Sequence, residues 1–134
     1  MRPEVPIALG LMSGTSGDGV SAALVSFQGR SFQLLATQTF PYPKSVREKI
    51  SRPIHLKINE ISSLHMELGR IFADAALKII RKALISPRKI KVIGSHGQTI
   101  YHGPRDSIPS TFQIGEAGVI AEKTQIPVVS DFRP

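Results

Sequence analysis

The stretch that decides the fold is residues 5–27, with the sequence VPIALGLMSGTSGDGVSAALVSF. It opens with an apolar run, Val5–Met12, and resumes after seven small or polar residues with a second run, Val20–Phe27. Short apolar runs bounded by turn residues are typical of buried strands. The intervening Ser13–Gly19 contains three glycines, which indicates a turn or loop. The pattern predicts two strands joined by a loop rich in glycine and hydroxyl groups.

The next part of the chain predicts a third strand and then a helix. The strand, Phe32–Phe40, follows a short turn, and three consecutive strands with short connections indicate an antiparallel meander. Ser45 and Glu48 have the spacing of a capping box, which opens a short helix that Pro53 ends.

The remaining residues alternate between helix and strand. Apolar residues at helical spacing predict a long amphipathic helix from about Asn59 to before Pro87. The last third predicts five features: a strand at Ile90–Gly94, a loop with a hairpin over residues 95–104, a strand at Thr111–Ile114, a helix at Glu116–Lys123, and a strand beginning at Val128. We therefore expect the α/β class, with a mixed sheet, N-terminal antiparallel strands and flanking helices.

Length and composition limit the class of protein. A chain of 134 residues is the size of one domain, which we place at residues 1–134. The absence of cysteine excludes disulfides, zinc–thiolate sites and thiol catalysis. No apolar run approaches the ~18 residues of a membrane-spanning helix, and Glu4 with two prolines interrupts the start where a signal peptide would be apolar. We expect a cytoplasmic protein that does not span a membrane.

The basic charge is concentrated in one segment. The formal net charge is +7, and residues 44–91 hold 12 Lys and Arg against 4 Asp and Glu. These cations fall mostly between the apolar positions of the predicted helices, as on a solvated helix face, and away from the glycine-rich loop. A nucleic-acid surface is the alternative, and the scarcity of aromatic residues for base stacking disfavours it. We expect no nucleic-acid partner.

The loop Ser13–Gly19 is the most specific local feature. Its backbone N–H groups and its Ser and Thr hydroxyls are donors suited to phosphate oxygens, and Asp18 is suited to orient magnesium through water. It is not a Walker A loop, because no Gly-Lys-Ser/Thr follows, and not a dinucleotide fingerprint, because a strand comes next. A plain hairpin turn is the alternative. Actin-like and hexokinase-like ATPases hold a phosphate with such a strand–loop–strand arrangement.

Further polar candidates follow the later predicted strands. His96 or Gln98, at the end of a strand, is placed to hydrogen-bond a polar ligand, or is a loop residue satisfied by backbone groups. Glu116, at a predicted helix start, complements the helix dipole or binds sugar hydroxyls at a cleft. Asp131 and Arg133 form a simple ion pair or contact a ligand at the mouth of the sheet.

The other histidines have less specific settings. His65 lies beside the apolar stripe of the long helix and is interpreted as a packing residue. His102 has no carboxylate or cysteine partner at ligand spacing, so a metal site there is disfavoured.

Three ordered motifs resemble those of anhydro-N-acetylmuramic acid kinases. They are GLMSGTSGDGVSAALV, IGSHGQTIYHGP and TFQIGEAGVIAEKTQIPVVSDFRP, which together extend from Gly10 to Pro134. The resemblance covers nearly the whole chain but only the first part of the family's sequence. It implies a ribonuclease H-like, actin-like ATPase fold, of which this chain would form the first lobe in incomplete form.

The resemblance also implies a reaction and its ligands. The family uses ATP with Mg²⁺ to open the 1,6-anhydro ring of anhydro-N-acetylmuramic acid with water and to phosphorylate the 6-hydroxyl, in peptidoglycan recycling. The ATP phosphates would be held by the loop and the start of the next strand, and the sugar by residues of the later motifs. The phosphate-loop residues are Gly14, Thr15, Ser16, Gly17, Asp18, Gly19, Val20 and Ser21, and the sugar-site residues are His96, Glu116, Asp131 and Arg133.

Two departures from the family pattern qualify this expectation. Ser21 stands where the family usually has Asp, which removes a carboxylate from the nucleotide end of the cleft. The family's base, an Asp in an Asp-Thr-Gly-Pro-Gly-Asn-like motif, is absent, so no catalytic residue is assigned and we expect a truncated N-terminal part that is inactive alone. A homodimer or a separate C-terminal chain is the expected partner. A non-catalytic phosphate- or sugar-binding module is the alternative function.

Overall fold

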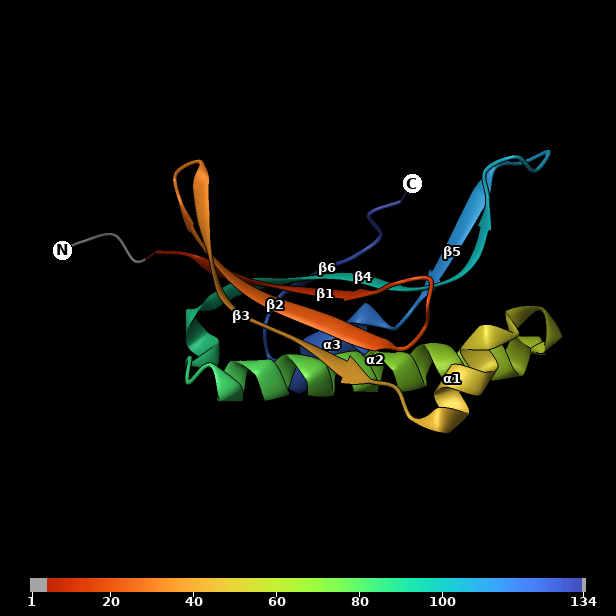
Figure 1. The fold of residues 1–134 in the computed structure, drawn as a ribbon, viewed down its shortest axis with the longest axis horizontal. Coiled ribbons are helices and arrows are strands. Elements are labelled where there is room, and N and C mark those ends of the chain that lie inside the picture. Colours follow the sequence, from red (N-terminus) through yellow and green to blue (C-terminus); the bar gives the residue numbers. More distant parts are fainter. Residues whose placement is uncertain (1–4, 134) are drawn as a thin grey trace.

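The first three strands form the predicted antiparallel meander. The computed structural model describes residues 5–133, and Figure 1 shows their arrangement. Strand β1 (Ile7–Ser13) pairs with β2 (Gly19–Gln28), and β2 pairs with β3 (Ser31–Pro41). The Ser13–Gly19 segment turns between β1 and β2, as its glycines predict.

The remaining elements follow in the predicted order. Two helices, α1 (Lys44–Ser51) and α2 (Ile58–Lys82), are separated by a 3-10 turn at Pro53–His55, and a second 3-10 turn at Pro87–Lys89 leads into the sheet. The last four elements are β4 (Ile90–Gly103), β5 (Ser110–Ile114), α3 (Ala117–Thr124) and β6 (Val128–Val129).

The sheet is mixed, which confirms the α/β class. Its order is β3-β2-β1-β4-β5, and β4 runs parallel to β1 and to β6. One edge of β4 pairs with β1, whereas the other edge pairs with β6 and β5 in turn. There β6 pairs with Ile93 and Gly94, and β5 pairs with residues from Gln98 onward. Residues 95–97 on this edge have no strand partner among the described residues, which leaves an opening in the sheet.

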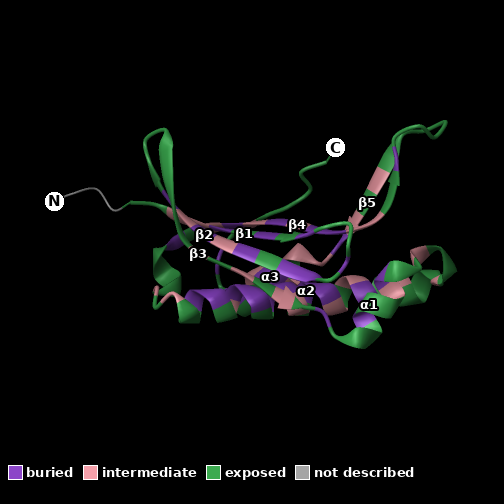
Figure 2. Cartoon of the chain, viewed as in Figure 1, coloured by how far each residue is buried: buried purple, intermediate pink, exposed green. Residues whose placement is uncertain are grey.

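The helices cover one face of this sheet. Figure 1 shows α1, α2 and α3 together below it, while the segment after β6 leads over the opposite face. Alternate residues of β2, namely Val20, Ala22 and Leu24, are buried against the helices, as the two-residue period of a strand requires. Figure 2 shows that the buried residues line this sheet–helix interface. On the opposite face Met12 is half exposed.

Two predicted local features differ from the structure. Residues 95–103, predicted as part of a loop, continue β4, because Ser95 pairs with Leu11 and the following residues pair with β5. The predicted hairpin is present between β4 and β5. The Ser45 capping box is wrong, because α1 begins one residue earlier, after Pro43, without a side-chain cap.

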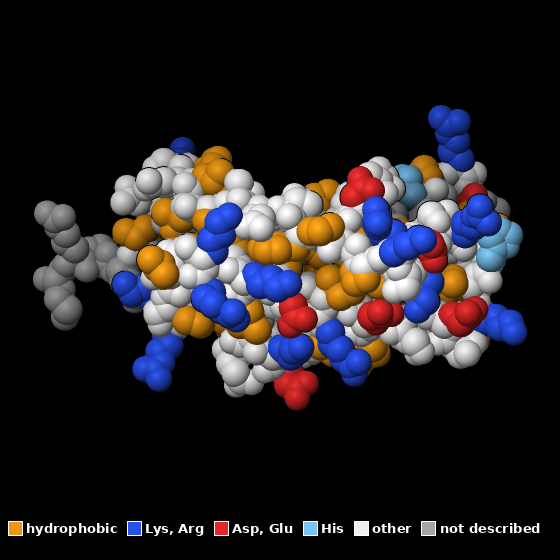
Figure 3. Space-filling view, turned by 60° about the horizontal axis from the view of Figure 1, so that its bottom comes forward, with side chains coloured by type: hydrophobic (Ala, Val, Ile, Leu, Met, Phe, Trp, Pro, Cys, Tyr) orange, Lys and Arg blue, Asp and Glu red, His pale blue; other side chains and the backbone are white. Residues whose placement is uncertain are grey.

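The helical face carries mixed charge. Figure 3 shows Lys and Arg side chains scattered over it with acidic side chains among them. Exposed pairs include Lys49–Glu67 at 3.5 Å and Lys123–Asp74 at 3.2 Å. This agrees with the predicted solvated helix face. Within residues 5–133, no helix is both long and apolar enough to cross a membrane.

Candidate functional site

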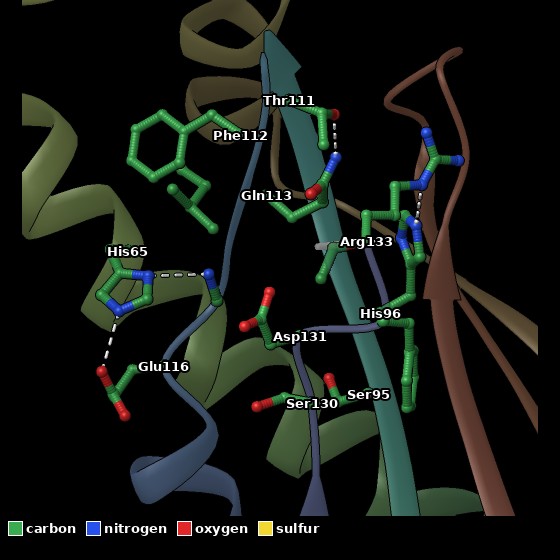
Figure 4. A pocket seen from close by; sticks show the side chains of 14 residues that line it. His65, Ser95, His96, Thr111, Phe112, Gln113, Glu116, Ser130, Asp131 and Arg133 are labelled. Carbon is green, nitrogen blue, oxygen red and sulfur yellow. Dashed lines mark hydrogen bonds and ion pairs between the residues drawn. The ribbon is translucent and has the colours of Figure 1, made fainter. Parts of the chain in front are cut away.

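A pocket opens where β4 lacks a strand partner. It has a volume of about 340 Å³ and lies between the split edge of β4, the start of α3, one turn of α2 and the segment after β6 (Figure 4). Its walls are contributed by four separate segments of the chain. The lining residues are His65, Ser95, His96, Gly97, Thr111, Phe112, Gln113, Ile114, Gly115, Glu116, Ser130, Asp131, Phe132 and Arg133.

All four residues predicted for the sugar site line this pocket. His96 comes from β4, Glu116 from the start of α3, and Asp131 and Arg133 from the segment after β6. They are separated by up to 37 positions in the sequence, and the sheet brings them together. β6 ends at this pocket, and so does the part of β4 that pairs with it. The carboxyl ends of parallel strands are where α/β sheets collect ligand-binding side chains.

Glu116 is held by two donors. Its Oε1 accepts the Gly118 N–H at 2.8 Å, so Glu116 caps α3, and its Oε2 lies 2.8 Å from His65 Nε2. The Gly118 N–H, followed by the His65 hydrogen bond, lowers the pKa of the Glu116 carboxyl below its ordinary value. The carboxylate is therefore both a structural cap and a fixed acceptor beside the pocket.

His96 and Arg133 are joined directly. The Arg133 Nε–H donates to His96 Nε2 at 3.0 Å, so that nitrogen carries a lone pair, and Nδ1–H donates to the Gly97 carbonyl at 3.2 Å. The alternative of an ion pair between Asp131 and Arg133 is wrong for the described residues, because the arginine turns to His96 instead. The guanidinium keeps further N–H donors for a ligand.

Two polar groups in the pocket lack an internal partner. Asp131 has a positive φ of 64°, which few residue types adopt readily, and Figure 4 shows its carboxylate directed toward the middle of the pocket. The Ser95 hydroxyl is buried and makes no hydrogen bond within residues 5–133. The Asp131 carboxylate is exposed and open to a ligand. Buried polar groups are normally paired, so the Ser95 hydroxyl is an exception among the described residues.

The glycine-rich loop is the second candidate site. A turn closes it, with the Gly17 N–H donating to the Gly14 carbonyl at 3.1 Å. The backbone N–H groups of Thr15, Ser16 and Asp18 have no hydrogen-bond partner within the described chain. Thr15 and Ser16 are consecutive, and successive backbone N–H groups in a turn are a known type of anion-binding arrangement. The loop therefore has the donors that phosphate oxygens need.

The other predicted loop residues belong to β2. Gly19 lies so close to Phe40 and Pro41 of β3 that a Cβ would overlap their backbone. The Val20 side chain is fully buried in the core, so only its backbone faces the loop. Ser21 forms a hydrogen bond of 2.9 Å with Thr39 on the adjacent strand.

Gln98 anchors the loop from within the core. It is fully buried, and its Nε2 donates to the carbonyls of Gly14 at 3.2 Å and Thr99 at 3.1 Å. Its Oε1 accepts from Tyr42 at 3.2 Å and lies beside the Ser13 hydroxyl. The prediction that Gln98 contacts a ligand is therefore wrong, because all of its polar atoms serve the protein interior.

Tyr42, which donates to Gln98, is also excluded from solvent. The side chain is 3% exposed, and burial raises the pKa of Tyr42 to about 12, partly offset by the neighbouring Ser13 hydroxyl. Deprotonation is disfavoured because a phenolate would lose its hydration in the core.

Two cations of α1 stand beside the loop. Lys44 and Arg47, with Glu48 and Ile50, line a hollow of about 400 Å³ whose other wall is residues 15–18 of the loop. The expectation that the basic charge lies away from the glycine loop is thus wrong for α1. The helix follows β3 directly and returns alongside the loop, with the Tyr42 N–H bound to the Asp18 carbonyl at 2.9 Å.

The residues present suit Mg²⁺ only in the company of phosphates. Within residues 5–133 no three His, Cys, Asp or Glu side chains cluster to hold a metal ion. Magnesium usually keeps several waters and takes one or two carboxylates together with substrate phosphates. The exposed Asp18 fits the carboxylate part of that description. His102 Nδ1 lies 3.3 Å from the Thr111 hydroxyl.

His65 is one of the pocket residues that the sequence analysis did not assign. His65 was interpreted as a packing residue, but it lines the pocket and binds both Gly115 and Glu116. A usable signal was the spacing of His65 and Gly69, which places a polar ring and a bare backbone on the same helix face, one turn apart.

Comparison with known proteins identifies a single family. The sequence profile of anhydro-N-acetylmuramic acid kinases matches residues 6–134. A protein named anhydro-N-acetylmuramic acid kinase from Caldanaerobacter subterraneus subsp. tengcongensis is 46% identical, over 97% of this chain and 36% of its own length. One of the same name from Vibrio vulnificus is 40% identical, over 93% and 35%. The chain thus spans about a third of the length of these relatives.

Among solved structures, a ROK hexokinase from Thermus thermophilus is similar to this chain. The match has a TM-score of 0.44 and 20% sequence identity, and it covers 93% of this chain and 34% of the hexokinase.

Proposed function

The chain belongs to the anhydro-N-acetylmuramic acid kinase family, and from this premise we propose that it forms the phosphate- and sugar-binding lobe of such a kinase. The proposed reaction opens the 1,6-anhydro ring of anhydro-N-acetylmuramic acid with water and transfers the ATP γ-phosphoryl group to the freed 6-hydroxyl. The products are N-acetylmuramic acid 6-phosphate and ADP, and the step serves peptidoglycan recycling.

The observation that carries the proposal is the shared location of the loop and the pocket. The loop leaves the carboxyl end of β1, residues 95–97 lie in the adjacent parallel β4, and Ser130–Arg133 follow the parallel β6. Gln98 links the two sites, because it follows the pocket-lining residues of β4 and binds the Gly14 carbonyl. A kinase needs its phosphate donor and its acceptor side by side, since phosphoryl transfer depends mainly on positioning.

We assign the phosphates of ATP to the Gly14–Ser21 segment. The free N–H groups of Thr15, Ser16 and Asp18 would bind phosphate oxygens, and Lys44 and Arg47 add positive charge beside them. Asp18 would hold Mg²⁺, directly or through water. When bound, the ion would neutralise negative charge on the phosphates. Ser21 contributes a neutral hydroxyl where the family usually has a carboxylate.

We assign the sugar to the 340 Å³ pocket. Glu116 and Asp131 would accept hydrogen bonds from sugar hydroxyls, and Arg133, oriented by His96, would donate to a carbonyl or carboxylate oxygen. Such convergent polar groups in a concave site fix the orientation of a ligand.

Turnover needs a base that these residues do not provide. The Asp-Thr-Gly-Pro-Gly-Asn-like motif that carries the family's base is not present in the 134 residues. We propose that this lobe binds ligands but does not turn them over alone, and that the base and adenosine site come from a second lobe on the same or a separate polypeptide. We further propose that the protein works in the cytoplasm, without nucleic acid.

Calorimetry on the chain tests the assignment of the two sites. The chain should bind anhydro-N-acetylmuramic acid and, separately, MgATP. Gly14→Val should abolish only nucleotide binding, because no protein atom lies within 4 Å of a Cβ at Gly14 and the added side chain would obstruct the phosphates instead. Glu116→Gln should weaken only sugar binding, and Glu122→Gln, an exposed change on α3, should alter neither.

The outcomes separate the parts of the proposal. Absence of heat with both ligands, from a chain shown to be folded by circular dichroism, would refute the binding assignments. Turnover of the sugar by the isolated chain at an ordinary kinase rate would refute the missing-base argument.

A further inference from the structure

One turn of α2 holds the start of α3 through side-chain and backbone contacts. His65 Nδ1 accepts the Gly115 N–H at 2.9 Å, and its Nε2 lies 2.8 Å from Glu116 Oε2. The His65 carbonyl also accepts the Glu116 N–H at 3.0 Å. Figure 4 shows the His65 imidazole next to Glu116, with a dashed hydrogen bond at each of its ring nitrogens. Three hydrogen bonds therefore connect one residue of α2 to two residues of the pocket wall.

The hydrogen-bond directions define the tautomer of His65. The Gly115 backbone N–H can only donate, so Nδ1 must present a lone pair to it. The proton of the neutral ring is then on Nε2, which donates to Glu116. A histidine arranged in this way orients its carboxylate partner, because neither ring nitrogen is free to exchange its role.

Gly69, one helical turn after His65, allows the start of α3 to pack closely against α2. A Cβ at position 69 would lie 2.8 Å from the Glu116 carbonyl oxygen and 3.1 Å from its nitrogen. Glycine therefore lets the Gly115–Glu116 backbone approach the helix closely enough for His65 to reach both residues.

We propose that His65 is a positioning residue of the sugar site, which fixes the Glu116 carboxylate so that its remaining lone pairs meet a sugar hydroxyl. This inference rests on the proposed function for its ligand and adds a residue of α2 to that site. A carboxylate offers about four lone-pair positions. The Gly118 N–H and the His65 Nε2–H occupy two of them, which leaves two for the ligand.

The competing explanation is that His65 only docks α3 onto α2. Under that explanation, the loss of His65 lowers stability, while a chain that stays folded keeps its carboxylate and its ligand affinity. Under the proposal, the Glu116 carboxylate itself changes, because it loses a donor that lowers its pKa.

The test compares three variants of the chain. His65→Ala removes both ring hydrogen bonds, and His65→Gln keeps an N–H donor and an acceptor on a side chain of similar reach. His55→Ala, an exposed change in the turn before α2, is the control. The pKa of Glu116 is measured by carbon-detected NMR titration of its carboxyl, and affinity for anhydro-N-acetylmuramic acid by calorimetry.

The proposal expects distinct results for each variant. In His65→Ala, the pKa of Glu116 rises toward its ordinary value of 4.5 without reaching it, because the Gly118 N–H remains. Its sugar Kd rises about tenfold, as for loss of a charge-assisted hydrogen bond. His65→Gln retains most of the affinity, and His55→Ala equals wild type. Nitrogen chemical shifts of His65 in wild type report a proton on Nε2.

Two results in a folded chain would overturn the proposal, and further measurements cover a variant that does not fold. An unchanged pKa of Glu116 in a folded His65→Ala chain overturns the proposal, and so does an unchanged sugar Kd in that variant. If His65→Ala does not fold, wild type itself decides. Nitrogen shifts that place the proton on Nδ1, or a pKa of Glu116 that is not lowered from its ordinary value, would then overturn the proposal. If wild type binds no sugar while the pKa shifts as expected, the proposed function fails and the coupling of His65 to Glu116 is upheld.

Discussion

The glycine-rich loop and the pocket that we assign to the sugar are built in opposite ways. The loop is one continuous stretch, and a buried glutamine from β4 anchors it to the core. The pocket is assembled from four segments at the partly exposed edge of the sheet. The loop therefore depends on the dry interior, whereas the pocket depends on how separate elements are spaced. The first should be sensitive to buried polar groups and the second to backbone separation.

The largest effect is expected at Gln98. Gln98→Ala would leave the Tyr42 hydroxyl and the Gly14 carbonyl without their buried partner and would open a cavity. We expect the free energy of unfolding to fall by about 3 kcal/mol, together with loss of MgATP binding. Urea denaturation measures it, with exposed Gln33→Ala as the matched control. If Gln98→Ala and Gln33→Ala lowered the free energy of unfolding by equal, small amounts, Gln98 would not be a stabilising anchor of the loop.

The next effect is a dependence of stability on pH, which tests whether water is excluded from the Tyr42 hydroxyl. The pKa of Tyr42 is raised to about 12 in the folded chain from an ordinary value of 10.0. The unfolded chain therefore deprotonates first, and the stability that this group contributes is present below pH 10 and lost as pH rises to 12. The stability advantage of wild type over Tyr42→Phe should shrink by about 2 kcal/mol across this range. A constant difference would mean that water reaches the hydroxyl.

A smaller effect tests backbone spacing at the pocket. Gly69→Ala should stabilise a helix by about 1 kcal/mol on propensity alone. Here the added Cβ meets the Glu116 backbone at 2.8 Å, so we expect a net loss of about 1–2 kcal/mol instead. Ser63→Ala, on the exposed side of α2, should be neutral or slightly stabilising. A rise in melting temperature in Gly69→Ala would show that α3 tolerates a wider separation.

The smallest effect sets two equally buried serines against each other. Ser13 and Ser95 are each 2% exposed, but Ser13 donates to the Gly19 carbonyl at 2.9 Å whereas Ser95 has no partner in residues 5–133. Ser13→Ala should lower the free energy of unfolding by about 1 kcal/mol, and Ser95→Ala should raise it by up to about 1 kcal/mol. Ser95→Ala should also weaken sugar binding. Equal losses of stability would show that Ser95 is satisfied within the chain.

Much of the fold was predictable because its signals are local. The apolar runs of β1 and β2, the glycines between them and the helical period of α2 are each readable from consecutive residues. Residues 95–103 were predicted wrongly because polar and glycine residues favour a loop. Pairing with β1 and then β5 overrides that preference, and Gly97 adopts a φ of 78° within the strand.

The site was predictable in its members but not in their contacts. The family motifs singled out Glu116 and Arg133, and both line the pocket. The ion pair offered for Arg133 was wrong, because its partner, His96, is 37 positions away. For His65, the one local signal was its spacing from Gly69, which by itself does not tell which groups the ring contacts.

The sequence by itself determined the order of elements, the loop with its donors, and membership of the kinase family. These follow from residue types at fixed short spacings, which act through local backbone preferences. Only the tertiary structure decided that Gln98 is an anchor rather than a ligand contact and that His65 belongs to the pocket. Their partners lie 84 and 51 positions away, and a hydrogen bond depends on distance in space, which packing of the sheet on α2 determines.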